Sequence, residues 1–438
     1  MGLNFVEEEI RRIKEKILDY SGYGLEFNPF PPSGVSPDTA DIETIRNFLS
    51  KYFYEKIRER EIKELVNGIV RTGYVEKTAG HMWLWGDWRV GKSAILMRLF
   101  LALRDELEDC ITVYVPKPRY GLVKSIYHYF VREYSAEFFF EITRKLLIML
   151  LSENPDLIKD EWVEIWKEGQ EELKNKSISE CKTKLLEEMK KNLIDVFSMI
   201  SEEAIDLEGL YNKSIVKLSR LGVTSNLIDM FTDPSIAPET LYKGIIELEE
   251  KRNYADHLIG LFTICRLVGY QHIFVFMDDV EDVIRIWTRG KSAREIDELN
   301  NFLDRMHQNL SFLGTMHPQF ASIFEERFPR FVGRVSGDPL NFTLVNVRPL
   351  ESDADLIEVV SYFISKACKN TPPYPTYPFR EEVLKDLHKN LGGKLGLILP
   401  SLHHLLRKGA EKGTETGNYP EIDMNFYEKV KKEVLGAV

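Results

Sequence analysis

Eight consecutive residues in the first quarter of the chain have the types and spacing needed to bind a polyphosphate. They match the pattern GxxxxGK[ST] and are followed by a small residue: Gly86, Asp87, Trp88, Arg89, Val90, Gly91, Lys92, Ser93 and then Ala94. Glycines let backbone N–H groups converge on phosphate oxygens, and the N-terminus of a following helix adds positive potential. The lysine adds charge for the phosphates, and the serine hydroxyl is a ligand for Mg²⁺. The pattern predicts a loop that binds ATP and Mg²⁺; the alternative is a chance match in a tight turn.

Two adjacent carboxylates supply the second chemical element of this interpretation. Asp278 and Asp279 directly follow the apolar run 273–277. A metal ion bound through one hydroxyl also needs a carboxylate, and an attacking water needs a base. We expect Asp278 to hold Mg²⁺ through its water shell and Asp279 to orient the water. The alternative is a strand that ends in two solvated acids.

Five apolar runs are expected to form the strands that position these residues, at 81–85, 111–115, 273–277, 312–315 and 342–347. Helical periodicity predicts a helix over 41–70 and another over 94–107. Strands separated by helices imply an α/β fold with a parallel sheet covered on both faces. We expect an N-terminal arm (1–50), a core (51–133 and 257–350), a helical insertion (134–256), and a helical lid with a C-terminal helix (351–438).

Composition excludes some classes of protein. A formal net charge of −11 argues against a whole face that binds nucleic acid, although a small basic patch is compatible with it. The four cysteines lie far apart and form no CxxC pair, which is typical of reduced thiols in the cytoplasm. Charged residues interrupt the most apolar stretches, 94–103 and 138–151, so no membrane span is expected.

Taken together, these motifs resemble the AAA+ ATPases, within the branch of archaeal origin-recognition proteins, STAND-type ATPases and the ATP-binding proteins of BREX phage-defence systems. Residues 58–65 (REREIKEL) look like the segment that precedes the phosphate loop there and helps to frame the nucleotide base. Residues 255–279 look like the helix, turn and strand that end in the Walker B acids of the BREX proteins. The resemblance spans roughly residues 50–125 and 245–410, and implies a three-layer αβα P-loop core of the ASCE type with ATPase activity.

The resemblance also implies roles for residues outside the two Walker motifs. Residues 312–318 occupy the place of the sensor 1 strand, so Thr315 or His317 would contact the γ-phosphate or the water. Residues 328–350 look like the arginine-finger block, with Arg334 as the leading candidate and Arg330 as the second. A finger acts on the nucleotide of a neighbouring subunit, so this match implies a homo-oligomer or assembly with a related ATPase subunit. The alternative for these arginines is surface solvation or an ion pair.

Three positions depart from the family pattern. Arg89 replaces a common glycine, so the loop is expected to be less open. Asp279 replaces a glutamate that is one methylene longer, so we expect either slow hydrolysis or a shared role for Glu281. Lys394 is the substitute candidate in the lid, where the family places a sensor 2 arginine.

Two further regions of the sequence are candidate binding surfaces for partner molecules. Four basic residues lie near Trp287 in the sequence: Arg285, Arg289, Lys291 and Arg294. They predict contact with double-stranded DNA. The alternative is a cationic loop that pairs with local acids. The insertion, with core positions expected at Trp162, Ile165, Trp166, Leu185 and Leu186, offers either a solvated surface or a docking surface. We therefore expect a Mg-dependent ATPase switch or motor subunit that acts in an oligomer on DNA or a DNA-associated complex. The alternative is a STAND-like signalling or scaffold ATPase with slow hydrolysis, which binds a partner protein through the insertion.

Overall fold

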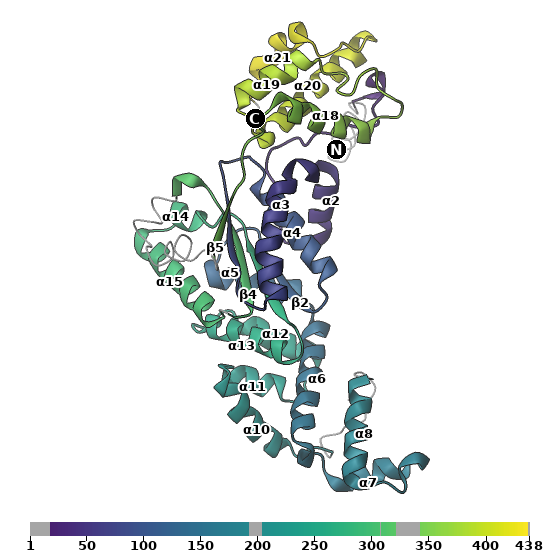
Figure 1. Ribbon diagram of the computed structural model, residues 1–438, viewed down its shortest axis with the longest axis vertical. Helices are drawn as coiled ribbons and strands as arrows, with labels where there is room; N and C mark the ends of the chain where they lie inside the picture. The colour runs from purple at the N-terminus through teal and green to yellow at the C-terminus, as the bar shows by residue number, and fades with distance from the viewer. Residues whose placement is uncertain (1–17, 192–203, 307, 321–341, 437–438) are drawn as a thin grey trace, which may run out of the picture.

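A parallel five-stranded sheet forms the middle of the molecule in this computed structural model (Figure 1). The structure describes residues 18–191, 204–306, 308–320 and 342–436. The strand order is β2-β3-β4-β1-β5, and every neighbouring pair is parallel. The strands are β1 (His81–Trp85), β2 (Cys110–Val115), β3 (His272–Met277), β4 (Leu310–Met316) and β5 (Phe342–Asn346). Each predicted apolar run forms one of these strands, so the α/β class and the parallel sheet are confirmed.

Side chains alternate along the strands and divide into two hydrophobic clusters. Trp83 belongs to the cluster on one face of the sheet and Leu84 to the cluster on the other. The first face packs against α5 (Leu122–Glu133), α13 (Tyr254–Leu267) and α15 (Arg289–Arg305). The second face packs against α2 (Ile42–Tyr52), α3 (Glu59–Val66) and α4 (Lys92–Glu106). Helices on both faces explain why the strands are apolar throughout, and they give the core three layers.

The winding of the sheet reverses at β1. α4, which follows β1, packs on the second face of the sheet, whereas α5 and α15, which follow β2 and β3, pack on the first. In open parallel sheets the crevice for a ligand lies outside the carboxyl ends of the strands, at the point of reversal. The segment between β1 and α4, which holds the predicted phosphate loop, lies at this point.

The predicted single helix over 41–70 is wrong. α2 ends at Tyr52, and Phe53 and Tyr54 are extended with φ of −111° each. A 3₁₀ turn (Glu55–Arg58), α3 and a π-helical stretch (Asn67–Val75) follow. Tyr52, Phe53 and Tyr54 form part of a pocket wall, and this tertiary packing overrides the local helical pattern.

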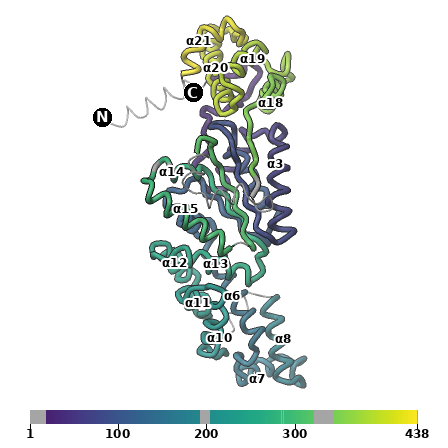
Figure 2. Tube along the Cα trace, turned by 60° about the vertical axis from the view of Figure 1, so that its left-hand side comes forward, coloured from purple at the N-terminus to yellow at the C-terminus, as the bar shows by residue number. Residues whose placement is uncertain are grey.

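Helices between α5 and α13 extend away from the sheet at one end of the molecule (Figures 1 and 2). They are α6 (Ala136–Glu153), α7 (Asp160–Glu168), α8 (Ile178–Lys191), α10 (Leu207–Arg220), α11 (Ser225–Phe231) and α12 (Pro238–Leu248). Their apolar side chains continue the cluster on the first face of the sheet. Four of the predicted core residues contribute to this cluster: Trp162, Trp166, Leu185 and Leu186. The prediction that Ile165 is a core residue is wrong, because its side chain is 70% exposed.

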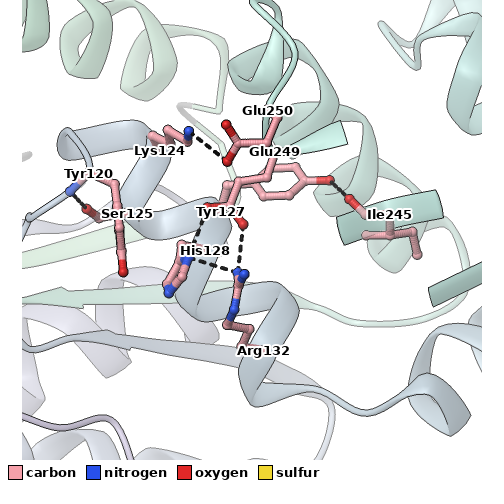
Figure 3. A network of polar contacts seen from close by, with 9 residues as sticks. All are labelled: Tyr120, Lys124, Ser125, Tyr127, His128, Arg132, Ile245, Glu249 and Glu250. Atoms are coloured by element: carbon pink, nitrogen blue, oxygen red, sulfur yellow. Dashed lines mark hydrogen bonds and ion pairs between the residues drawn. The ribbon is translucent and has the colours of Figure 1, made fainter. Parts of the chain in front are cut away.

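A polar network fixes the junction between α5 and the end of α12 (Figure 3). The buried Glu249 carboxylate lies 2.9 Å from Nδ1 of His128 and accepts a hydrogen bond from Arg132 at 2.6 Å. Nearby, the hydroxyl of Tyr127 donates to the carbonyl of Ile245 at 2.7 Å. Burial lowers the pKa of His128 despite the neighbouring carboxylate. The base of the insertion is thus held by hydrogen bonds as well as by apolar packing.

Four helices lie at the opposite end of the sheet (Figures 1 and 2): α18 (Asp353–Ala367), α19 (Glu381–Leu391), α20 (Leu395–Thr416) and α21 (Met424–Gly436). Their shared cluster also contains Tyr23, Leu25 and Phe30 from the N-terminal segment. Further elements are short: α14 (Asp282–Ile286) and 3₁₀ turns at Ser21–Tyr23, Pro155–Leu157, Glu171–Leu173 and Pro318–Phe320.

Two further findings concern the cysteines and the length of the apolar helices. All four cysteines are free thiols, as the sequence predicts. Within the described ranges, we find no helix that combines the length and the apolar character needed to cross a bilayer.

Candidate functional site

The predicted phosphate loop curls tightly between β1 and α4. Gly91 has a φ of 103°, and a Cβ on Gly86 would lie only 2.4 Å from the carbonyl oxygen of Val347. Arg89 adopts a left-handed φ of 65°, which costs an L-residue roughly 1–2 kcal/mol. This conformation gives a physical reason why glycine suits the position, and Arg89 occupies it with the same curl.

Lys92 lies within the curl of its own loop. The side chain is buried, and Nζ donates hydrogen bonds to the carbonyl oxygens of Gly86 at 2.7 Å and Asp87 at 2.9 Å. Burial lowers the pKa of Lys92, and the surrounding carboxyls of Glu281, Asp278 and Asp279 oppose this shift. The ammonium is therefore presented from the loop toward a group of acids.

Ser93, Asp278, Asp279 and Thr315 meet at the carboxyl ends of adjacent strands. The hydroxyl of Thr315 donates to Asp278 Oδ1, and the backbone N–H of Asp279 donates to Thr315 Oγ1 at 2.9 Å. The side chain of Ser93 favours the charged form of Asp278 and so opposes the rise in its pKa. β4 lies between β1 and β3, which allows Thr315 to bridge the two acids from a fully buried position. Thr315 thus holds both carboxylate residues in place.

Three carboxyl groups share this buried region. Burial raises the pKa of Asp278, and burial together with the charge of Asp278 raises the pKa of Asp279 to about 7. Burial, with a smaller contribution from Asp279, raises the pKa of Glu281 to about 8. Among the described residues, Oε2 of Glu281 has no hydrogen-bond partner. Among the described residues, no group of three or more histidine, cysteine or acidic side chains is arranged to hold a metal ion, so the raised pKa values reflect burial and mutual repulsion.

His317 faces the phosphate loop rather than the two acids. Its ring stacks on Trp88 with centroids 3.9 Å apart, and its Nε2 lies 3.4 Å from Asp87 Oδ1. Lys394, from the segment before α20, pairs with the same carboxylate at 2.9 Å. Burial and the charge of Lys92 lower the pKa of His317, whereas the hydrogen bond from Lys394 lowers that of Asp87. Asp87 therefore connects the loop to both β4 and the C-terminal helices.

A pocket of about 960 Å³, its open mouth included, adjoins the loop. Val90, Lys92, Ser93, Ala94 and Asp279 line it on one side. The opposite walls are mainly apolar and come from three regions: Phe48, Tyr52, Phe53, Tyr54 and Ile57 around α2; Val359, Phe363, Leu395 and Leu399 of the C-terminal helices; and residues 31 and 33–36. The pocket is thus lined by polar residues of the loop with Asp279, and by aromatic and aliphatic residues from two other parts of the chain.

Arg58 secures the wall of this pocket. Its guanidinium is buried and donates to the carbonyl oxygens of Val90 at 2.6 Å and Arg348 at 2.9 Å. Burial lowers the pKa of Arg58, and the adjacent Glu61 carboxylate opposes that shift. One side chain therefore joins the phosphate loop to the segment that leads from β5 into α18.

Some residues predicted to take part in catalysis or binding are not part of the arrangement described above. Arg330 and Arg334 fall outside the described residues. The four basic residues of the predicted DNA site are exposed around α14 and the first turns of α15. Arg285 pairs with Asp282 at 3.1 Å, and the ammonium of Lys291 lies 4.2 Å from the centroid of the Trp287 ring. This basic surface is therefore partly engaged with its own neighbours.

No known protein family model matches this chain, and no curated protein matches it. The site residues missed from the sequence are mostly those of the aromatic wall of the pocket. A run of three aromatics, Tyr52 to Tyr54, was a visible signal, because such a run would otherwise expose ring surface to water.

Proposed function

We propose that this chain is a Mg-dependent P-loop ATPase of the AAA+ type. The observation that carries the proposal is the meeting of Lys92 and Ser93 with Asp278 and Asp279 beside an aromatic pocket, at the reversal point of a parallel sheet. A nucleotide needs these two neighbouring environments, because its phosphates are charged and its base is an apolar stacking surface. Their adjacency favours a nucleoside triphosphate over an isolated phosphate.

The donor set on the polar side of the pocket fits Mg²⁺. The hydroxyl of Ser93 and the carboxylate of Asp278 are hard oxygen donors, and Ser93 favours the charged form of that carboxylate. Bound Mg²⁺ would neutralise charge on the phosphates. Lys92 would exchange its carbonyl partners for phosphate oxygens, while Asp279 orients a water molecule and accepts its proton.

The test of this proposal is calorimetry with ATP and Mg²⁺, together with phosphate release. Lys92→Ala is expected to lose nucleotide binding, and Asp279→Asn is expected to bind ATP but not turn it over. Lys145→Ala is the matched control, because this lysine lies on α6 and pairs there with Glu141. Absence of binding heat for the wild-type chain, or normal binding by Lys92→Ala, would reject the proposal.

Assembly and DNA binding are extensions of this proposal. Arg334 would act on the nucleotide of a neighbouring copy or related subunit, so Arg334→Ala should bind ATP normally yet fail to assemble or hydrolyse. The exposed basic residues around Trp287 support duplex DNA as the partner. ATP turnover should then rise with DNA, and binding should weaken steeply with salt. A flat response to both would remove DNA from the proposal.

The second candidate is a slowly hydrolysing STAND-like switch, which one observation favours. The C-terminal helices contact the phosphate loop directly, through Lys394 to Asp87 and through the N–H of Gly396 to the carbonyl of Arg89 at 2.8 Å. Contacts of this kind couple nucleotide occupancy to the position of the helices. Slow turnover with a large nucleotide-dependent change in particle size, and no DNA response, would support this candidate.

A further inference from the structure

A short segment between the C-terminal helices and α2 forms one wall of the pocket. We call residues 31–37 the strap, and five of them line the pocket: Pro31, Ser33, Gly34, Val35 and Ser36. Prolines at 31, 32 and 37 restrict its backbone to extended conformations. Within the described ranges, no hydrogen bond joins the strap to the rest of the chain. The strap is therefore a stiff segment whose position depends mainly on the two points where it is attached.

One end of the strap is attached firmly to the C-terminal helices. The ring of Phe30 is fully buried in their cluster and lies edge-on to Phe379, with centroids 5.7 Å apart. Nδ1 of His403 in α20 lies 2.8 Å from the carbonyl oxygen of Phe30, and the side chain of Asn28 donates to the carbonyl oxygen of His403 at 3.1 Å. This end of the strap therefore moves together with α20.

The other end is attached to the core by an exposed ion pair. The carboxylate of Asp38 pairs with Arg119 in the loop after β2, and its Oδ2 lies 3.9 Å from Nζ of Lys117. The Asp38 side chain is 32% exposed and that of Arg119 is 58% exposed. Pairs with this exposure change an equilibrium by at most about fivefold. The next firm point is Asp41, which caps α2 by accepting from the N–H of Thr44 at 2.8 Å.

The middle of the strap contacts the phosphate loop through the first turn of α20. A Cβ on Gly34 would overlap the carbonyl oxygen of Gly396, so the two backbones touch directly. The N–H of Gly396 donates to the carbonyl oxygen of Arg89 at 2.8 Å, and a Cβ on Gly396 would lie 2.8 Å from that of Arg89. The strap, α20 and the phosphate loop are therefore stacked with no side chain between their backbones, and the contact leaves no room for one.

We propose that the strap is a gate for the nucleotide, which closes where Gly34 meets Gly396 and opens when Asp38 leaves Arg119. The inference rests on the proposed function, because that function makes a nucleotide the ligand of the pocket. Release of Asp38 frees the segment up to the cap of α2, while Phe30 stays fixed on α20. The strap can then swing away from the pocket without unfolding either helix. Such a gate changes the rates of entry and exit together and leaves the affinity nearly constant.

The experiment follows binding of mant-ADP, a fluorescent form of ADP, with Mg²⁺ to the full chain by stopped flow, and its release after a chase with unlabelled ADP. Asp38→Asn and Arg119→Met should each raise both rate constants about three- to fivefold, with Kd changed less than about twofold. Gly34→Ala should raise both about tenfold, because the added methyl group prevents closure. Asp105→Asn is the matched control, since it breaks an exposed ion pair between α2 and α4 and should keep both wild-type rates.

The two rate constants separate a gate from a structural support. Unchanged rates in both Asp38→Asn and Arg119→Met would overturn the inference. Faster release with unchanged or slower entry would also overturn it, because Kd would then rise and the ion pair would only hold the pocket in shape. If Gly34→Ala does not fold, the two ion-pair variants decide. A wild-type chain that binds no ADP is a different result, which rejects the proposed function itself and the inference with it.

Discussion

Replacing Thr315 by valine tests the buried bridge between the two strand-end acids. Valine has nearly the same shape, so the change removes two hydrogen bonds with little change in packing: one donated to Asp278 and one accepted from the N–H of Asp279. A bond to a charged group contributes about 1.5–3 kcal/mol and a neutral one about 0.5–1.5 kcal/mol. Thr315 is fully buried, so water cannot replace either bond. We expect the free energy of unfolding to fall by about 2–4 kcal/mol.

Urea titration of the nucleotide-free chain measures this loss, and Thr315→Ser is the control. Serine keeps the hydroxyl and removes one methyl group, which costs about 1 kcal/mol. The valine variant should therefore be less stable than the serine variant and should bind Mg-ATP about tenfold more weakly, because Asp278 loses the donor that orients it. If valine is as stable as the wild type, or more stable than serine, the bridge does not position the acids.

Three further predictions concern groups around the site. Glu281→Gln should be more stable than the wild type at pH 8 and equal to it at pH 5. The folded pKa of Glu281, about 8, exceeds its unfolded value, so the wild type loses stability as the pH rises toward 8. Thermal melting of both chains across this pH range measures the difference. Arg58→Met should lower the free energy of unfolding by about 3 kcal/mol, since two buried carbonyls lose a charged donor; Arg58→Lys should restore less than half in chemical denaturation. Glu249→Ala should destabilise the chain by about 2–3 kcal/mol by leaving Arg132 and His128 unpaired, whereas Glu250→Ala, which removes an exposed pair, should cost under about 1 kcal/mol in the same assay.

Much of the core could be predicted from sequence, for identifiable physical reasons. Each strand is a short apolar run because helices cover both faces of the sheet, and such runs stand out against the charged sequence around them. The loop at Gly86 to Ser93 combines a fixed spacing with a strand before it and a helix after it, which leaves few alternative structures. Where Asp278 lies relative to Ser93 also follows, because parallel strands end at a common edge.

The remaining features depend on tertiary packing that one sequence does not encode locally. The helical period continues through Phe53 and Tyr54, yet their rings turn into the pocket and break the helix there. Ile165 fits a helical apolar stripe, but nothing in the pattern indicates that α7 leaves that position in solvent. His317 follows the same strand as Thr315, and only the folded chain shows that it stacks on Trp88 instead of approaching the acids.

The continuous apolar packing from the sheet into α6 has a mechanical consequence. α6 has 18 residues and is therefore about 27 Å long, and its side chains belong to the same cluster as Trp83 of β1. Apolar packing along a helix of this length resists bending, so α6 moves as one stiff rod. A tilt of a few degrees at the sheet would displace α7 and α8 by several times the movement at the root, so the far tip of the molecule is where a small change at the sheet would be easiest to observe.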